Sequence, residues 1–251
     1  MLEREKKTIP FGLSAFDLKL LAMAFMLCDH IWGVFLVGHE WLTCIGRLAF
    51  PAFAFMIVEG YYHTSDLRRY LRRLLVGALI SEIPFNLMRG GIFYPVHQNV
   101  LWTFLIGLLC ITLIERVKEK GKRWLTGVVG AAVAVLGFLL GYMTMADYYG
   151  PGVLTVLTFY LFRGRTWRHL AGQFLCLYYL NVELLGGYGY VFPLFGQEFF
   201  LVQQSLALLA LIPIWLYRGE QGYHSKGFQC FCYAFYPAHM LALALIRMIA
   251  F

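Results

Sequence analysis

The sequence predicts an all-α, polytopic integral membrane protein, built as one bundle of about nine transmembrane helices. Three observations predict this class. Of the 251 residues, 60% are hydrophobic and only 14% are charged, whereas a soluble domain carries about a quarter charged residues. The mean hydropathy is +0.66. The 21 Lys and Arg residues gather in short loops between apolar runs, which is typical of membrane topology. This distribution offers no surface for nucleic acid.

Nine apolar runs approach the length of about 20 residues that a helix needs to cross a bilayer. The sixth run is short, and Asn181 and Glu183 interrupt the seventh. The loops between runs are too short for a soluble domain, so residues 1–251 are expected to form a single domain in the lipid bilayer. The expected spans are 18–38, 41–62, 70–88, 97–115, 124–143, 150–163, 168–186, 199–217 and 228–250.

Every second loop is basic, which predicts an orientation. Because basic loops stay in the cytoplasm, the N-terminus is expected in the cytoplasm and the C-terminus outside. The first apolar run is too long for the core of a signal peptide and is expected to remain as the first span. The basic segments contain Arg4, Lys6 and Lys7; Arg68, Arg69, Arg72 and Arg73; Arg116, Lys118, Lys120, Lys122 and Arg123; Arg163, Arg165 and Arg168; Arg218 and Lys226.

Four ionisable residues of the first three spans fall at one depth. At about 1.5 Å per helical residue, Asp29, His30, Arg47 and Glu82 all lie roughly 10 Å inside the outer boundary. Ionisable groups are costly inside a bilayer and usually have a function there. The sequence therefore predicts a polar site in the outer half of the bundle. Further polar residues lie just above this depth, namely Asn86, Gln98, Asn99 and, in an outer loop, Asp147.

Asp29 and His30 are neighbours in sequence, so on a helix their side chains point about 100° apart. We therefore expect Asp29 to pair with Arg47 across the first helical hairpin. His30 is then expected to face a cavity, oriented by a group from another helix, with Glu82 as one candidate. The alternative is that these residues form ion pairs and hydrogen bonds that only hold helices together.

Two further groups of polar residues lie elsewhere in the chain. Glu59 and His63 end the second span on the cytoplasmic side. The cluster that follows them anchors the topology, and because arginine suits polyanions it could also bind phosphates; it consists of Arg68, Arg69, Arg72 and Arg73. His239 follows Pro237 in the last span and is expected near the middle of the membrane. The six cysteines lack zinc-site spacing, so no metal site is expected.

Several motifs, in this order along the chain, resemble the TraX family. They are Asp29-His30, FPAFAF at 50–55, EGYYHT at 59–64, SEIPFN at 81–86, QNV at 98–100, Asp147-Tyr148 and FYPAH at 235–239. The family is known for acetylating the N-terminus of pilin, and is distantly similar to the acyltransferase-3 group and to heparan glucosaminide N-acetyltransferase. Tyr149 departs from the glycine expected after Asp-Tyr.

The resemblance implies a multi-pass enzyme of the bacterial cytoplasmic membrane that transfers an acetyl group. The donor would be cytoplasmic acetyl-CoA, and the acceptor an amine or hydroxyl at the outer side, on a protein N-terminus or a glycan. The residues that it implicates are Asp29, His30, Glu59, Glu82, Asn86, Gln98, Asn99, Asp147 and His239. The residues expected to bind the substrate are Asn86, Gln98, Asp147, Tyr148 and His239. A homo-oligomer is compatible with the sequence.

Acyl transfer needs a general base, and His30 has a suitable ordinary pKa. Arg47 or Asn99 could stabilise the oxyanion, and the four clustered arginines could hold the phosphates of the donor. Two other functions remain open. A proton-coupled transporter or flippase could use the same intramembrane polar layer, and a non-catalytic membrane assembly protein needs only the basic loops and apolar spans.

Overall fold

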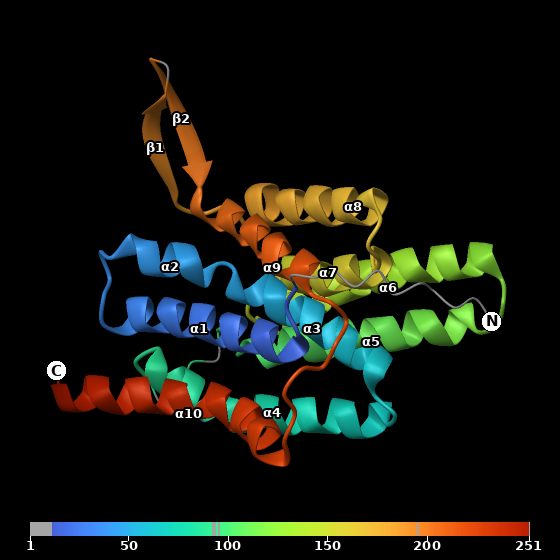
Figure 1. Ribbon diagram of the computed structural model, residues 1–251, viewed down its shortest axis with the longest axis horizontal. Coiled ribbons are helices and arrows are strands. Elements are labelled where there is room, and N and C mark those ends of the chain that lie inside the picture. The colour runs from blue at the N-terminus through green and yellow to red at the C-terminus, as the bar shows by residue number, and fades with distance from the viewer. Residues whose placement is uncertain (1–11, 92–93, 95, 195, 251) are drawn as a thin grey trace.

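The computed structural model describes residues 12–250 except 92–93, 95 and 195. Most helices run along one common axis, with their connections gathered at the two ends (Figure 1). The α-helices are α1 (Ala15–Val34), α2 (Glu40–Gly46), α3 (Ala49–His63), α4 (Leu67–Met88), α5 (Val100–Lys118), α6 (Arg123–Met143), α7 (Tyr149–Leu161), α8 (Trp167–Tyr178), α9 (Leu211–Leu216) and α10 (Lys226–Ala250). The remaining elements are the π-helical segment η1 (Tyr179–Leu185), the strands β1 (Gly189–Leu194) and β2 (Gln197–Val202), and the 3₁₀ segment η2 (Gln203–Ala210).

The helical class and the membrane nature of the chain agree with the sequence. Among the described residues, four helices are long and apolar enough to cross a membrane: Glu40–His63, which joins α2 to α3, and α5, α6 and α10. The count of nine spans and the orientation of the termini stay predictions. The basic residues Arg4, Lys6 and Lys7 lie outside the described residues.

Three expected spans differ from the structure. The expected helix 199–217 begins with β2, which pairs with β1 as an antiparallel hairpin. This expectation was wrong because hydropathy alone does not separate a short apolar strand from a helix. The span 168–186 leaves α-helical geometry at Tyr179, where η1 begins. The span 41–62 is interrupted at Arg47-Leu48, between α2 and α3.

The core of the bundle surrounds α7, which is buried along most of its length. Close helix approach depends on glycine here, because a Cβ on Gly107 of α5 would lie 2.8 Å from Val156 of α7. Outward faces of α6 and α10 expose large apolar side chains such as Val135, Leu139 and Ile246. Apolar exteriors around a packed interior suit a chain surrounded by lipid.

Candidate functional site

A cavity of about 50 Å³ lies between α1, α3, the start of α5, the loop before α7, and α10. Its polar lining comes from Asp29, His30, Asp147, Tyr148 and Tyr236. Aromatic rings form much of the remaining wall, and Phe50 stacks on Tyr148 with ring centroids 3.9 Å apart. A mostly apolar cavity with a few convergent polar groups is the usual form of a small-molecule site.

Two histidines form a hydrogen-bonded chain at this cavity. Nδ1 of His239 lies 2.6 Å from the backbone oxygen of Phe235. A carbonyl oxygen can only accept, so this nitrogen carries the hydrogen. In a neutral ring, Nε2 of His239 is then an acceptor, and it lies 2.6 Å from Nδ1 of His30. His30 therefore donates through Nδ1, and its own Nε2 is left as an unprotonated base.

The predicted pair of Asp29 with Arg47 is confirmed. Nη2 of Arg47 lies 2.5 Å from Oδ1 of Asp29, and Thr43 donates to the same oxygen at 2.8 Å. Gly46 lets α1 and α2 approach closely here, because a Cβ at this position would lie 2.6 Å from Oδ1 of Asp29. Both side chains are half-buried, and a charge withdrawn from water in this way needs such partners. The Asp29–Arg47 pair thus fixes the position of α1, the helix that carries His30.

Arg47 continues this network away from the cavity. Its Nη1 donates to Gln204 at 3.2 Å, and Gln204 in turn donates to Asn181 of η1 at 2.9 Å. These bonds join α2 to η2 and η1, which explains the polar Asn181 inside the seventh apolar run. Since Nε, Nη1 and Nη2 of Arg47 all donate to protein groups, its guanidinium is used mainly in structure.

Glu82 does not orient His30. Its Oε2 accepts from Asn99, and also from Nε1 of Trp102 at 3.1 Å. Asn99 caps α5 by accepting from the amide of Leu101 and donates to the backbone of Ala78. Its amide is therefore occupied in joining α4 to α5, which argues against the oxyanion role expected of it. The predicted layer of four residues is divided into an Asp29–Arg47 pair, His30 and a separate Glu82–Asn99 pair.

Three buried oxygens on α4 have no hydrogen-bond partner within the described residues: Ser81 Oγ, Glu82 Oε1 and Asn86 Oδ1. Buried polar atoms are nearly always satisfied. Asn86 was expected to bind substrate, but it is not among the residues that line the cavity.

The loop before α7 and the first residue of that helix are held in an uncommon conformation. Met145, Tyr148 and Tyr149 all have positive φ, of 52°, 61° and 47°, although none is glycine. Such strain persists only where the surroundings impose it. The backbone of Gln98 pairs with this loop, donating to Met145 and accepting from Asp147, and Thr103 donates to the backbone oxygen of Asp147. Gln98 thus supports the loop through its main chain.

His97 was not predicted as a site residue. Its Nε2 lies 2.9 Å from Oδ1 of Asp147. Burial alone would raise the pKa of Asp147, but the hydrogen bond and charge of His97 outweigh it, and with Arg89 and Arg47 they hold this pKa below its usual value. The signal that could have found His97 is its position directly before Gln98-Asn99. Tyr236, another missed residue, lines the cavity beside the predicted His239.

The comparisons with known proteins follow this geometry. The family model described as TraX protein matches residues 14–247. The chain belongs to the TraX family. A relative from Dichelobacter nodosus named probable fimbrial assembly protein FimC, serogroup H1, is 27% identical over 94% of this chain and 96% of its own. Protein TraX of Escherichia coli is 27% identical over 57% of this chain and 54% of its own. No solved structure matches the chain.

At the opposite end of α3, this TraX-family protein has a separate polar cluster. Glu59 binds Arg163 through two hydrogen bonds, of 2.7 and 3.3 Å, and the guanidinium of Arg163 lies over the ring of Tyr62. Nδ1 of His63 donates to the backbone oxygen of Glu59, 2.8 Å away. Glu59 and His63 therefore lie outside the His30 cavity, and Glu59 connects α3 to the loop between α7 and α8.

The expected phosphate-binding arginines are exposed at the start of α4. Arg69 pairs with Asp66 at 3.4 Å, and Arg73 lies over the ring of Tyr233. Arg68 and Arg72 have neither ion pair nor hydrogen bond to any described residue, so they remain accessible to a ligand. Among the described residues, no group of three or more His, Cys, Asp or Glu side chains could hold a metal ion.

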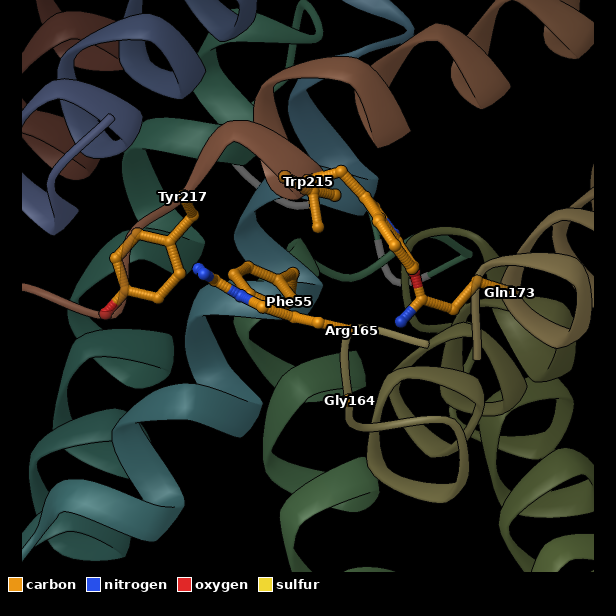
Figure 2. A pocket seen from close by; sticks show the side chains of 7 residues that line it. Phe55, Gly164, Arg165, Gln173, Trp215 and Tyr217 are labelled. Atoms are coloured by element: carbon orange, nitrogen blue, oxygen red, sulfur yellow. The ribbon is translucent and has the colours of Figure 1, made fainter. Parts of the chain in front are cut away.

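A second hollow, of about 30 Å³, lies between α3, α8, α9 and the loop before α8. Figure 2 shows the side chain of Arg165 extending past Phe55 toward Tyr217, with Trp215 and Gln173 on the other side. At about 100° per residue, Phe55 points away from the face of α3 that carries Phe50 and Phe53. The hollow therefore lies on the other side of α3 from the His30 cavity.

Proposed function

We propose that this protein is a membrane-embedded acyltransferase that moves an acetyl group from acetyl-CoA to an amine or hydroxyl at the outer side of the membrane. One observation carries the proposal: the hydrogen-bonded chain from Phe235 through His239 fixes His30 with an unprotonated Nε2 at a cavity. Membership of the TraX family supports it. The nine-span topology and the cytoplasmic N-terminus are part of the proposal.

In the proposed reaction, Nε2 of His30 accepts the proton of the acceptor as its nitrogen or oxygen attacks the thioester carbonyl carbon. When the tetrahedral intermediate collapses, the carbon–sulfur bond breaks and the imidazolium returns the proton to the departing thiolate. His239 stabilises the charge that develops on His30, and the Asp29 carboxylate adds a negative charge to the same cavity. The donor phosphates would bind Arg68 and Arg72, which have no ionic partner among the described residues.

The experiment uses the purified protein in lipid nanodiscs with acetyl-CoA and a simple amine, and it follows release of the CoA thiol. His30→Ala should lower kcat by about 10²–10⁴-fold, the usual effect of losing a general base. His224→Ala is the matched control, because His224 lies in the loop before α10 and its hydrogen-bond partner among the described residues is Gln229, near the start of that helix. Wild-type transfer by His30→Ala protein would exclude the proposed base.

A second candidate function is suggested by the relative named a fimbrial assembly protein. In that case the chain would assist assembly of a surface structure without catalysis. The two functions differ in their dependence on His30. An assembly role predicts that His30→Ala protein, once it is folded and inserted, supports the surface structure as well as wild type.

A further inference from the structure

The hairpin β1–β2 projects away from the bundle near α2 and η2 (Figure 1). Its side chains are unusually apolar for such an exposed element. Val191 and Phe200, which face each other across the strands, are 60% and 62% exposed. A two-stranded hairpin is at best marginally stable in water, and exposed apolar patches usually mark an interaction site. Lipid or a partner must therefore cover it.

The two edges of the hairpin differ in their hydrogen-bonding capacity. Gln203 donates to the backbone oxygen of Tyr188 at 2.8 Å, so these residues form a hydrogen-bonded pair. Pairs alternate along an antiparallel ladder, which makes Val191↔Phe200 and Pro193↔Glu198 non-hydrogen-bonded pairs. The N–H and C=O groups of such residues point outward, away from the partner strand.

Pro193 consequently lies at an outward position of β1. Because proline has no N–H, this edge is less able to pair with another strand. The outward positions of β2 are Glu198, Phe200 and Val202; the C=O of Val202 belongs to the start of η2 as its N-cap, so this edge offers the N–H and C=O groups of Glu198 and Phe200 and the N–H of Val202. Within the described residues neither edge pairs with a third strand. Lipid tails cannot pair these backbone groups, whereas an extended polypeptide can do so by adding a strand.

The base of the hairpin contacts α2, the helix that contributes Gly46 to the wall of the His30 cavity. Tyr190 lies 3.4 Å from Sγ of Cys44 in α2 and accepts from Gln203 at 2.8 Å. Cys44 is two residues before Gly46, which lines the His30 cavity. Residues two apart on a helix point about 160° apart, so the hairpin contacts the face of α2 opposite Gly46, and the N-terminal residues of a strand held on β2 would have to extend past α2 to reach the candidate site.

We propose that the outer edge of β2 binds the acyl acceptor, and that this acceptor is an extended polypeptide whose alternate side chains are apolar. This inference rests on the proposed function, because only an acyltransferase has an acyl acceptor. Main-chain hydrogen bonds to Phe200 and Val202 would give affinity, and the exposed Val191–Phe200 face would select apolar side chains.

The test compares Phe200→Pro with Phe200→Ala in nanodiscs. Both variants remove the ring, but only proline removes the outward N–H, and it does so at a position that leaves the hairpin's own bonds intact. The probes are a ten-residue alternating Val/Thr peptide with a free N-terminus and, as a small acceptor, glycinamide. Phe200→Pro should raise KM for the peptide at least about fivefold above that of Phe200→Ala, with kcat and KM for glycinamide unchanged. Equal KM values for the peptide in the two variants would overturn the proposal.

Amide hydrogen exchange separates this proposal from the reaction. The peptide should protect the amides of Phe200 and Val202 in wild-type protein even if neither probe is acetylated, an outcome that would overturn only the proposed function. Absence of protection overturns the hairpin proposal. The proposal is also overturned if these amides are protected in the absence of peptide. Protection in nanodiscs but not in detergent indicates that lipid covers the strand. Protection together with a doubled particle mass indicates that a second copy of the chain covers it.

Discussion

Nδ1 of His30 lies 2.6 Å from Nε2 of His239, although 209 residues separate them in the sequence. This contact joins the two helices that contribute most to the candidate base, α1 and α10. It also determines which nitrogen of His30 is unprotonated, because the other nitrogen of His239 is already bonded to Phe235. The functional state of His30 is thus controlled from the far end of the chain.

His239→Ala should therefore lower kcat by about 10-fold or more, since removing a group that orients a catalytic imidazole commonly costs 10- to 100-fold. His239→Gln should recover part of this loss, because the amide oxygen can accept from Nδ1 of His30. KM for the acceptor should change little in either variant. Steady-state kinetics in nanodiscs measures both quantities. If alanine and glutamine are equally impaired, the role of His239 is packing and not orientation.

The sequence predicted the Asp29–Arg47 pair because it is local: the two residues lie at similar distances from the turn that joins the first two spans. The same reasoning could not predict the partner of His30, which depends on how α10 packs beside α1 and α4. The depth of Glu82 was derivable from its position in the third span. Its direction was not, because depth leaves the rotation of a helix undetermined, and Glu82 turns toward Asn99 instead.

The hairpin was missed for a different reason. Hydropathy windows long enough to find spans average over a six-residue strand. The local composition did contain a signal, since residues 188–202 are rich in aromatic residues and include two valines and two glycines, as strands and turns favour. Read at that scale, the segment indicates two strands and not the start of a helix.

Gly46→Ala should destabilise the protein. The added Cβ would lie 2.6 Å from Oδ1 of Asp29, so α1 and α2 must separate, and overpacking of this kind costs about 1–3 kcal/mol. Gly33→Ala is the matched control on α1, because nothing lies within 4 Å of its added Cβ, and alanine favours a helix by up to about 1 kcal/mol. Thermal unfolding in detergent compares the two. Equal melting temperatures would contradict the close contact.

Asp147 should make stability depend on acidic pH. Its pKa is held below the ordinary value of 3.8 in the folded state, so the unfolded state binds its proton more readily. The stabilisation is complete above the ordinary pKa and is lost as pH falls through the folded value. Melting temperature should therefore fall more steeply below about pH 4 in wild type than in Asp147→Asn. Parallel pH profiles of the two proteins would exclude this linkage.

Tyr149 offers a test of the strained loop, at the position where the family resemblance predicts glycine. Its φ of 47° disfavours any residue with a Cβ, at a cost of about 1–2 kcal/mol. Alanine and glycine both remove the stacking on Tyr142, but only glycine relieves the strain. Tyr149→Gly should thus melt higher than Tyr149→Ala. The reverse order is expected at Gly127, an unobstructed helical position in α6, where alanine should be the more stable.

Donor binding distinguishes the two basic regions at the predicted cytoplasmic end. Arg68 and Arg72 lie one turn apart on α4 and have no ionic partner among the described residues. Removing both should therefore weaken CoA binding. This loss of affinity should be smaller at high salt, because exposed charges are screened. Arg165→Ala is the comparison, since Arg165 belongs to the hollow on the other side of α3 (Figure 2). Calorimetric titration of CoA into nanodiscs at low and high salt measures both effects. Weaker binding after Arg165→Ala alone would instead assign the phosphates to that hollow and would require a path for the donor around α3 to His30.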